Sequence, residues 1–161
     1  MTGMLTHETE IHLDAEVPLV RITREFDAPR AKVFRAHTDP ELLVQWLGPR
    51  RLTMVVEHYD CRTGGSYRYV HSGEDLTEHW FHGSFHEVVP DELIVQTFSY
   101  EGFPGHVALE RLTLEDLGGD RTRIVGTSLT DSFAGRDAFV ASGMEEGVVD
   151  GYLRLDELLA H

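Results

Sequence analysis

The sequence has one cysteine, one lysine, no asparagine and no long hydrophobic run. Because Cys61 has no partner within the chain, an internal disulfide is excluded, and with it the class of disulfide-rich secreted domains. No stretch approaches the roughly 18 consecutive apolar residues that a membrane-spanning helix needs. The first residues also lack the basic start and apolar core of a signal peptide. We therefore expect a cytoplasmic protein, and the arginine-rich, asparagine-free composition favours a bacterial source.

Basic residues are scarce relative to acidic ones. The 161-residue chain has 14 Lys and Arg against 28 Asp and Glu, a formal net charge of −14. A charge of this sign repels nucleic acids and anionic membranes, so we expect neither as a partner. The length is enough for one domain with its own core. We predict an N-terminal arm or early strand over residues 1–16 and a single domain over residues 17–161.

The apolar pattern predicts a fold of sequential strands that ends in a helix. Residues 17–26 alternate as in a strand, although Arg24 interrupts the apolar face. Asp27 and Asp39, each followed closely by proline, have the pattern of N-caps of two short helices. Short turns separate the expected strands that follow, which predicts an antiparallel meander. These strands are expected at residues 51–60, 66–71, 77–89, 93–100, 107–115 and 121–129. The last 28 or so residues have helical apolar spacing.

Four segments of the chain resemble one family. They are REFDAPRAKVFRAHTDPELLVQWLGP (24–49), DCRTGGSYRY (60–69), HGSFHEVVPDELIVQTF (82–98) and ASGMEEGVVDGYLRLDELL (141–159). In this order they resemble the family related to the C-terminal domain of the heat-shock-protein-90 ATPase activator, within the START and birch-pollen-allergen-like (SRPBCC) superfamily. The resemblance implies an α+β helix-grip fold, in which a curved antiparallel sheet of about seven strands wraps round a long C-terminal helix. It also implies two short helices after the first strand and a ligand cavity between sheet and helix.

Candidate ligand-binding residues come from the apolar and aromatic positions of the strands and the last helix. They are Trp46, Met54, His58, Tyr69, Phe81, Phe85, Phe98, Met144, Val148 and Tyr152. His58 is the first choice for a polar group facing inward, because it continues the alternation of Met54 and Val56. Other polar candidates on strands are Arg68, Glu87, Gln96 and Glu110.

Three glycines, Gly143, Gly147 and Gly151, are spaced by four residues and would share one face of the last helix. Each costs about 1 kcal/mol relative to alanine within a helix. Two interpretations remain open. The stripe allows close packing of the helix, or it leaves volume for a ligand.

Metal, cofactor and nucleophile motifs give no support for a catalytic set. His82 and His86 would share a strand face about 13 Å apart, whereas one zinc ion needs ligands at about 2 Å. We therefore expect no metal site. The sequence has no G-x-S-x-G elbow, Walker A motif or dinucleotide fingerprint, so we predict no cofactor and name no catalytic residue.

The first functional hypothesis is a domain that binds a small apolar or aromatic molecule without assigned catalysis. The resemblance leaves two alternatives, an enzyme of the polyketide cyclase or dehydratase kind and a protein partner that stimulates a chaperone ATPase. It also allows a homodimer.

Overall fold

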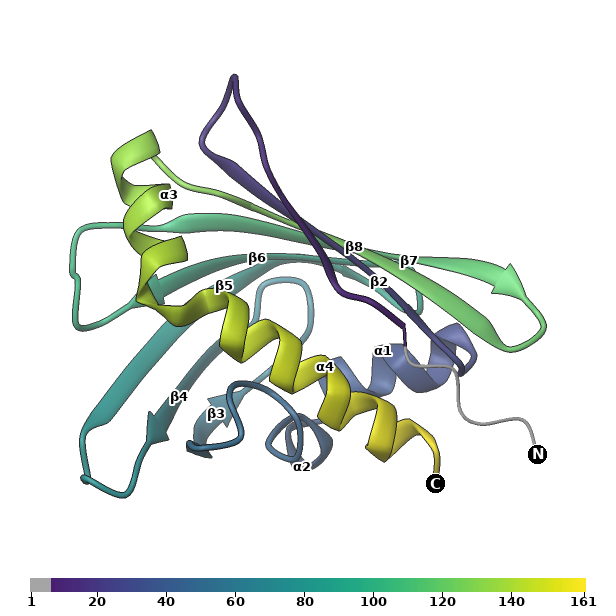
Figure 1. Ribbon diagram of the computed structural model, residues 1–161. Helices are drawn as coiled ribbons and strands as arrows, with labels where there is room; N and C mark the ends of the chain where they lie inside the picture. Colours follow the sequence, from purple (N-terminus) through teal and green to yellow (C-terminus); the bar gives the residue numbers. More distant parts are fainter. Residues whose placement is uncertain (1–6) are drawn as a thin grey trace.

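The computed structural model describes residues 7–161 and has one antiparallel sheet with helices against one of its faces (Figure 1). The strands are β1 (Glu10–Leu13), β2 (Leu19–Phe26), β3 (Thr53–Tyr59), β4 (Ser66–Ser72), β5 (Glu78–Val89), β6 (Leu93–Tyr100), β7 (Ala108–Gly118) and β8 (Arg121–Leu129). The helices are α1 (Arg30–Thr38), α2 (Pro40–Leu43), α3 (Phe133–Phe139), the π-helical turn η1 (Val140–Met144) and α4 (Glu145–Leu159).

The sheet order is β1-β2-β8-β7-β6-β5-β4-β3. Strands β3 to β8 form the predicted meander, and β2 pairs with β8. The predicted helix-grip α+β fold is therefore confirmed. The sheet has eight strands rather than about seven, because Glu10–Leu13 pairs with β2 inside the segment expected to be an arm or early strand. Residues 1–6 of that segment lie outside the described residues.

Apolar side chains of the inner sheet face, the face toward α4, form two neighbouring clusters. One joins β2, β8 and the helices, with Phe26, Ile124 and Leu155 almost inaccessible to solvent. The other lies between β4, β5 and β6 around Tyr67 and Phe85. The clusters share half-buried residues, so the inner face is one continuous surface beneath the helix.

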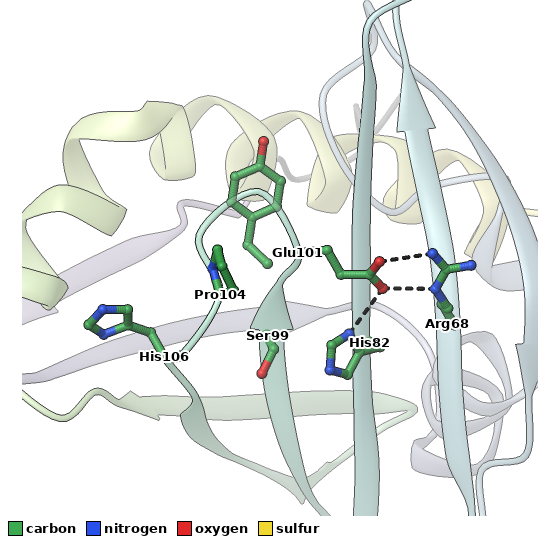
Figure 2. Close-up of a pocket in the computed structure, with 8 residues that line it drawn as sticks. Arg68, His82, Ser99, Glu101, Pro104 and His106 are labelled. Carbon is green, nitrogen blue, oxygen red and sulfur yellow. Dashed lines mark hydrogen bonds and ion pairs between the residues drawn. The ribbon is translucent and has the colours of Figure 1, made fainter.

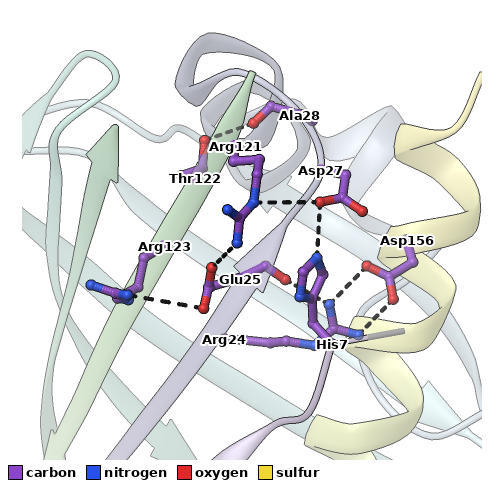
Figure 3. Close-up of polar contacts among 9 residues, drawn as sticks. All are labelled: His7, Arg24, Glu25, Asp27, Ala28, Arg121, Thr122, Arg123 and Asp156. Carbon is purple, nitrogen blue, oxygen red and sulfur yellow. Dashed lines mark hydrogen bonds and ion pairs between the residues drawn. The ribbon is translucent and has the colours of Figure 1, made fainter. Parts of the chain in front are cut away.

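Arg24, which interrupts the apolar face of β2, ties the sheet to α4 (Figure 3). Its guanidinium is fully buried and donates to both carboxylate oxygens of Asp156, at 2.9 and 2.5 Å. Its Nε has no hydrogen-bond partner among residues 7–161. A buried arginine needs a carboxylate partner such as Asp156, because burying an unpaired charge away from water costs free energy. The ion pair therefore fixes the helix over this end of the sheet.

The two short helices begin differently from each other. Asp39 caps α2 as predicted, and its side chain accepts a hydrogen bond from the Glu41 amide at 2.9 Å. The prediction for Asp27 is wrong, because α1 begins after Pro29 without a side-chain cap. Asp27 instead lies beside His7 and Arg121 (Figure 3).

Candidate ligand site on the inner sheet face

A row of three polar side chains crosses the inner face where the central strands pair. Gln96 of β6 lies opposite Glu110 of β7, and Glu110 lies opposite Ser128 of β8. Ala108 and Leu114 are buried on the same face of β7, because alternate residues of a strand point the same way. Glu110 thus places a carboxyl group on the inner face of the sheet. We call Gln96, Glu110 and Ser128 the polar row.

Glu110 is enclosed by protein but keeps contact with accessible space. Burial raises the pKa of Glu110 to about 7, and the Ser128 hydroxyl opposes part of this shift. The Ser128 Oγ itself is buried and has no hydrogen-bond partner among residues 7–161. Glu110 is nevertheless only half-buried by surface accessibility. Glu110 therefore keeps accessible surface on the inner face, although it is not part of the lining of either hollow described below.

Four tyrosines stand near enough to Glu110 to respond to its charge, namely Tyr59, Tyr67, Tyr69 and Tyr152. Burial is the main cause that raises the pKa of Tyr67, Tyr69 and Tyr152, and the charge of Glu110 raises each pKa further. Tyr67 and Tyr69 come from β4, whereas Tyr152 comes from α4. The polar row therefore faces aromatic side chains from both the sheet and the helix.

An aromatic wall leads from these tyrosines to a hollow beneath α3. The ring of Phe81 stacks between Tyr69 and Phe98, with centroid distances of 5.4 and 5.3 Å. The ring of Phe98 in turn packs beside that of Phe139 of α3, with 6.2 Å between the ring centroids. The hollow has a volume of about 320 Å³, and its lining is mostly apolar. Its wall includes Phe98, Tyr100, Phe103, Val107, Ala108 and Phe139.

The hollow and the polar row are adjacent. Phe98 and Ala108 pair across β6 and β7, two residues along from the pair of Gln96 and Glu110. Two residues of a strand span about 7 Å. The backbone of Glu110 therefore lies about 7 Å along β7 from that of Ala108, which lines the hollow.

A second hollow, of about 330 Å³, lies around the turn after β6 and has a polar lining (Figure 2). Glu101 accepts hydrogen bonds from Arg68 Nε and Nη2, both at 2.8 Å, and contacts His82 Nδ1 at 3.0 Å. The Arg68 guanidinium also covers the ring of Trp80, 3.9 Å from its centroid. The hydrogen bonds from Arg68, more than those from His82, lower the pKa of Glu101 to about 2. Its charged groups already have partners within the protein.

The structure places most of the predicted cavity residues around the inner face. Met54, Tyr69, Phe81, Phe85 and Phe98 belong to or pack on the cluster between β3 and β6. Trp46 is buried, donates to the Ala36 carbonyl at 2.9 Å and stacks on Tyr152. Met144 is buried and Val148 is half-buried along the helix. Trp46 and Phe85 are among the packed core, while Phe98 lines the hollow beneath α3.

The expectation that His58 faces inward is wrong. A β-bulge between Val56 and His58 shifts the register of β3. Tyr59 consequently packs against both clusters, and the His58 side chain is 49% exposed and lies 3.1 Å from the Ser66 hydroxyl. A bulge adds one residue to a strand and so reverses the facing of everything after it. Glu87, another polar candidate, is exposed as well.

The glycine stripe does not remain on one helix face. Gly143 has φ +99° and breaks the helix between α3 and α4. A Cβ on Gly151 would lie 3.1 Å from the Trp46 carbonyl oxygen, and one on Gly147 would lie 3.4 Å from Pro49 Cδ. Close packing of α4 against the segment after α2 therefore accounts for these two glycines, and neither leaves volume beside the polar row.

His71 is an inward polar residue that the sequence analysis missed. It is buried between the rings of Tyr69 and Phe81, and its Nδ1 has no hydrogen-bond partner in the described part of the chain. Burial lowers the pKa of His71 to about 4, so the ring is neutral at physiological pH. The signal available in the sequence was the position of His71 two residues after Tyr69, because residues two apart on a strand share a face. Within residues 7–161, no three His, Cys, Asp or Glu side chains gather as a metal site.

The fold and its inner face define a helix-grip domain of the START and birch-pollen-allergen-like (SRPBCC) superfamily. The chain belongs to the family described as activator of Hsp90 ATPase homolog 1-like protein, whose model matches residues 27–160. No curated protein sequence matches it. Among helices of residues 7–161, none has the length and apolar character required to cross a membrane.

Solved bacterial structures share this fold over nearly the whole chain. Protein Ms6760 from Mycobacterium smegmatis is 22% identical, with a TM-score of 0.86, over 94% of this chain and 96% of its own. A protein from Arthrobacter aurescens is 25% identical, with a TM-score of 0.86, over 94% and 91%. A protein from Rhodobacter sphaeroides is 25% identical, with a TM-score of 0.84, over 94% and 97%. These likenesses support the fold assignment.

Proposed function

We propose that this domain binds a small, mainly aromatic or apolar molecule between the inner sheet face and the C-terminal helix. The observation that carries the proposal is the apolar hollow beneath α3, whose Phe98 and Ala108 wall continues along β6 and β7 to the polar row. Its volume of about 320 Å³ lies at the lower end of the range for ligand pockets. Family membership supports a ligand-binding domain of this fold.

Two features distinguish this region from an ordinary packed core. Its lining includes the aromatic side chains of Tyr100 and Phe139, which border the hollow without filling it. Glu110, two residues along β7 from the lining residue Ala108, keeps accessible surface on the inner face. An apolar pocket with a few converging polar groups is the usual form of a small-molecule site.

The test is binding of N-phenyl-1-naphthylamine, a neutral aromatic probe whose fluorescence rises in apolar sites. Ala134 and Ala138 of α3 are both exposed, but only Ala138 lines the hollow. We expect Ala138→Trp to fill the hollow and weaken probe binding about tenfold or more, since much of the apolar contact area is lost. Ala134→Trp serves as the matched control and should bind normally. Absence of probe binding, or equal binding by both variants, would overturn the proposal.

An enzyme of the polyketide cyclase or dehydratase kind is the second candidate, and one observation favours it. Such an enzyme needs an acid or base inside the cavity. His58 and Glu87 are exposed, but Glu110 lies inside with a pKa near the working pH. The chaperone-partner role, the homodimer and the cytoplasmic location stay predictions.

A further inference from the structure

Glu110 is the one charged member of the polar row, and the row has apolar neighbours at both ends. Val20 lies opposite Ser128 on β2, and Phe85 lies opposite Gln96 on β5. Both are almost fully buried. A carboxyl group surrounded in this way requires a hydrogen-bond partner, because leaving a buried acceptor unpaired costs free energy.

Two donors beside Glu110 on the sheet are directed to other groups. Tyr67 donates its hydroxyl hydrogen to the Thr97 carbonyl at 2.6 Å, and Gln96 Nε2 donates to the Tyr67 oxygen at 3.2 Å. The Ser128 hydroxyl lies close enough to oppose the rise in the pKa of Glu110, but it is not in hydrogen-bond geometry with any group of the described residues. The Glu110 carboxyl group therefore keeps acceptor capacity for a further donor.

Among residues 7–161, no cation contributes to the pKa of this carboxyl group either. Arg24 is the buried arginine of the inner face, and both of its terminal nitrogens bind Asp156. The titratable groups that surround Glu110 from β3, β4 and α4 are tyrosine hydroxyls, and burial keeps them neutral by raising each pKa: Tyr59, Tyr67, Tyr69 and Tyr152. The ionised form of Glu110 would repel a ligand carboxylate or sulfonate, whereas it would attract a neutral hydrogen-bond donor.

We propose that Glu110 accepts a hydrogen bond from a hydroxyl or amino group of the bound molecule, so the site selects phenols and aryl amines over aromatic compounds without a donor. This inference rests on the proposed function and names the ligand class for the same site. Discrimination of this kind is strong when a site contains a polar group that the wrong ligand leaves unpaired. The aromatic wall of Tyr69, Phe81 and Phe98 supplies the surface for the ring.

The experiment compares 2-naphthol with 2-methoxynaphthalene by displacement of N-phenyl-1-naphthylamine at pH 7.5. The two compounds share the ring and the oxygen, but only naphthol has a hydrogen to donate. We expect the wild-type protein to bind naphthol about tenfold more tightly or better, as for a hydrogen bond to a charged group. Glu110→Met should bring the ratio of dissociation constants close to one. Glu115→Met changes an exposed residue of the same strand and should keep the ratio.

The outcomes separate this inference from the proposed function. If the wild-type protein binds both naphthalenes equally, donor selection is wrong while binding of aromatic molecules stands. If neither compound nor the probe binds, the proposed function fails first. If Glu110→Met does not fold, as judged by circular dichroism, the wild-type ratio still decides, and Glu110→Gln supplies the variant comparison. A ratio that survives in folded Glu110→Met would also overturn the inference.

Discussion

Glu101 and Glu110 are two half-buried glutamates separated by one turn, and their surroundings differ in pairing and in depth. Glu101 lies in the polar hollow with Arg68 bound to both of its oxygens (Figure 2). Glu110 lies on the inner face with no cation beside it. The pKa of Glu101 falls to about 2, whereas that of Glu110 rises to about 7.

The difference shows that pairing with a cation lowers the pKa of one carboxyl group, while burial without a cation raises the pKa of the other. Both residues have intermediate exposure. The Arg68 pair holds Glu101 as an anion with a structural role, and Asp156 has a comparable arginine partner in Arg24. Glu110 has no such partner, so it remains available to a ligand or a proton. Substituting these two glutamates should therefore change the free energy of unfolding in opposite directions. Loss of Glu101 should lower it, and loss of Glu110 should raise it.

The largest effect is expected where a paired carboxylate is removed from a buried arginine. Asp156→Asn leaves the fully buried Arg24 without its counter-charge. We expect the free energy of unfolding, measured by urea denaturation, to fall by about 3 kcal/mol or more. The adjacent Glu157→Gln is the control, because its bond to Arg50 lies in solvent. A loss equal to that of the control would show that the Arg24–Asp156 pair contributes no more to the free energy of unfolding than an exposed ion pair does.

The second effect concerns the unpaired carboxyl group and depends on pH. The folded pKa of Glu110, about 7, lies above its ordinary value of 4.5. Folding therefore favours the protonated form, and wild-type stability should fall as pH rises from about 4.5 to about 7. Glu110→Gln removes this penalty. We expect the variant to exceed the wild type by roughly 1 to 3 kcal/mol at pH 8 and to match it near pH 4.5.

Urea denaturation of both proteins across this pH range checks the result. All other titrating groups are common to the two proteins, so their difference isolates Glu110. A difference that stays constant with pH, or grows toward low pH, would contradict a buried and unpaired carboxyl group.

Sequence patterns predicted the fold well because strand alternation, turn residues and caps act locally. The meander from β3 to β8 follows from short connections, and Asp39 caps α2 as its position beside Pro40 indicates. The broken helix was harder to predict. The apolar spacing continues past Gly143, whereas its φ of +99° separates α3 from α4. Glycine permits this conformation but does not require it.

The polar residues of the site were harder to predict, because strand facing depends on register. One bulge after Val56 moved His58 outward and Tyr59 inward, and no local signal marks that bulge. Gln96 and Glu110 were among the polar candidates, yet their cross-strand pairing appears only in the assembled sheet. Ser128 joins them by the same pairing. Aromatic cavity residues were easier, since large apolar side chains on strands usually face the core.

A third and smaller effect should follow from replacing Glu101, the paired glutamate of the hollow around the turn after β6. Glu101→Gln removes the partner of Arg68, which keeps its contacts with Glu57 and Trp80. Because the pair is partly exposed, we expect a loss of only about 0.5 to 1 kcal/mol at pH 7. The folded pKa of Glu101 lies below 4.5, so its stabilisation is present above pH 4.5 and is lost as pH falls toward 2. The gap between variant and wild type in urea denaturation should therefore narrow below pH 4.5. Its sign is opposite to that for Glu110→Gln, because Glu101→Gln is the less stable protein at neutral pH.

The smallest effect is expected on replacing His58. A small effect there would support the contrast between Glu110 on the inner face and polar groups at the surface. The sequence pattern assigned His58 to the inner face, and an inward histidine would change ligand binding when replaced. In the structure its side chain is 49% exposed and contacts Glu57 and Ser66 at the surface. His58→Gln should alter the free energy of unfolding by less than about 0.5 kcal/mol, as is usual for surface substitutions. Titration with 2-naphthol should give the wild-type dissociation constant, since the bulge that turns His58 outward leaves Glu110 as the polar contact. A weakened affinity in this variant would place His58 inside after all, and the register of β3 would have to be reconsidered.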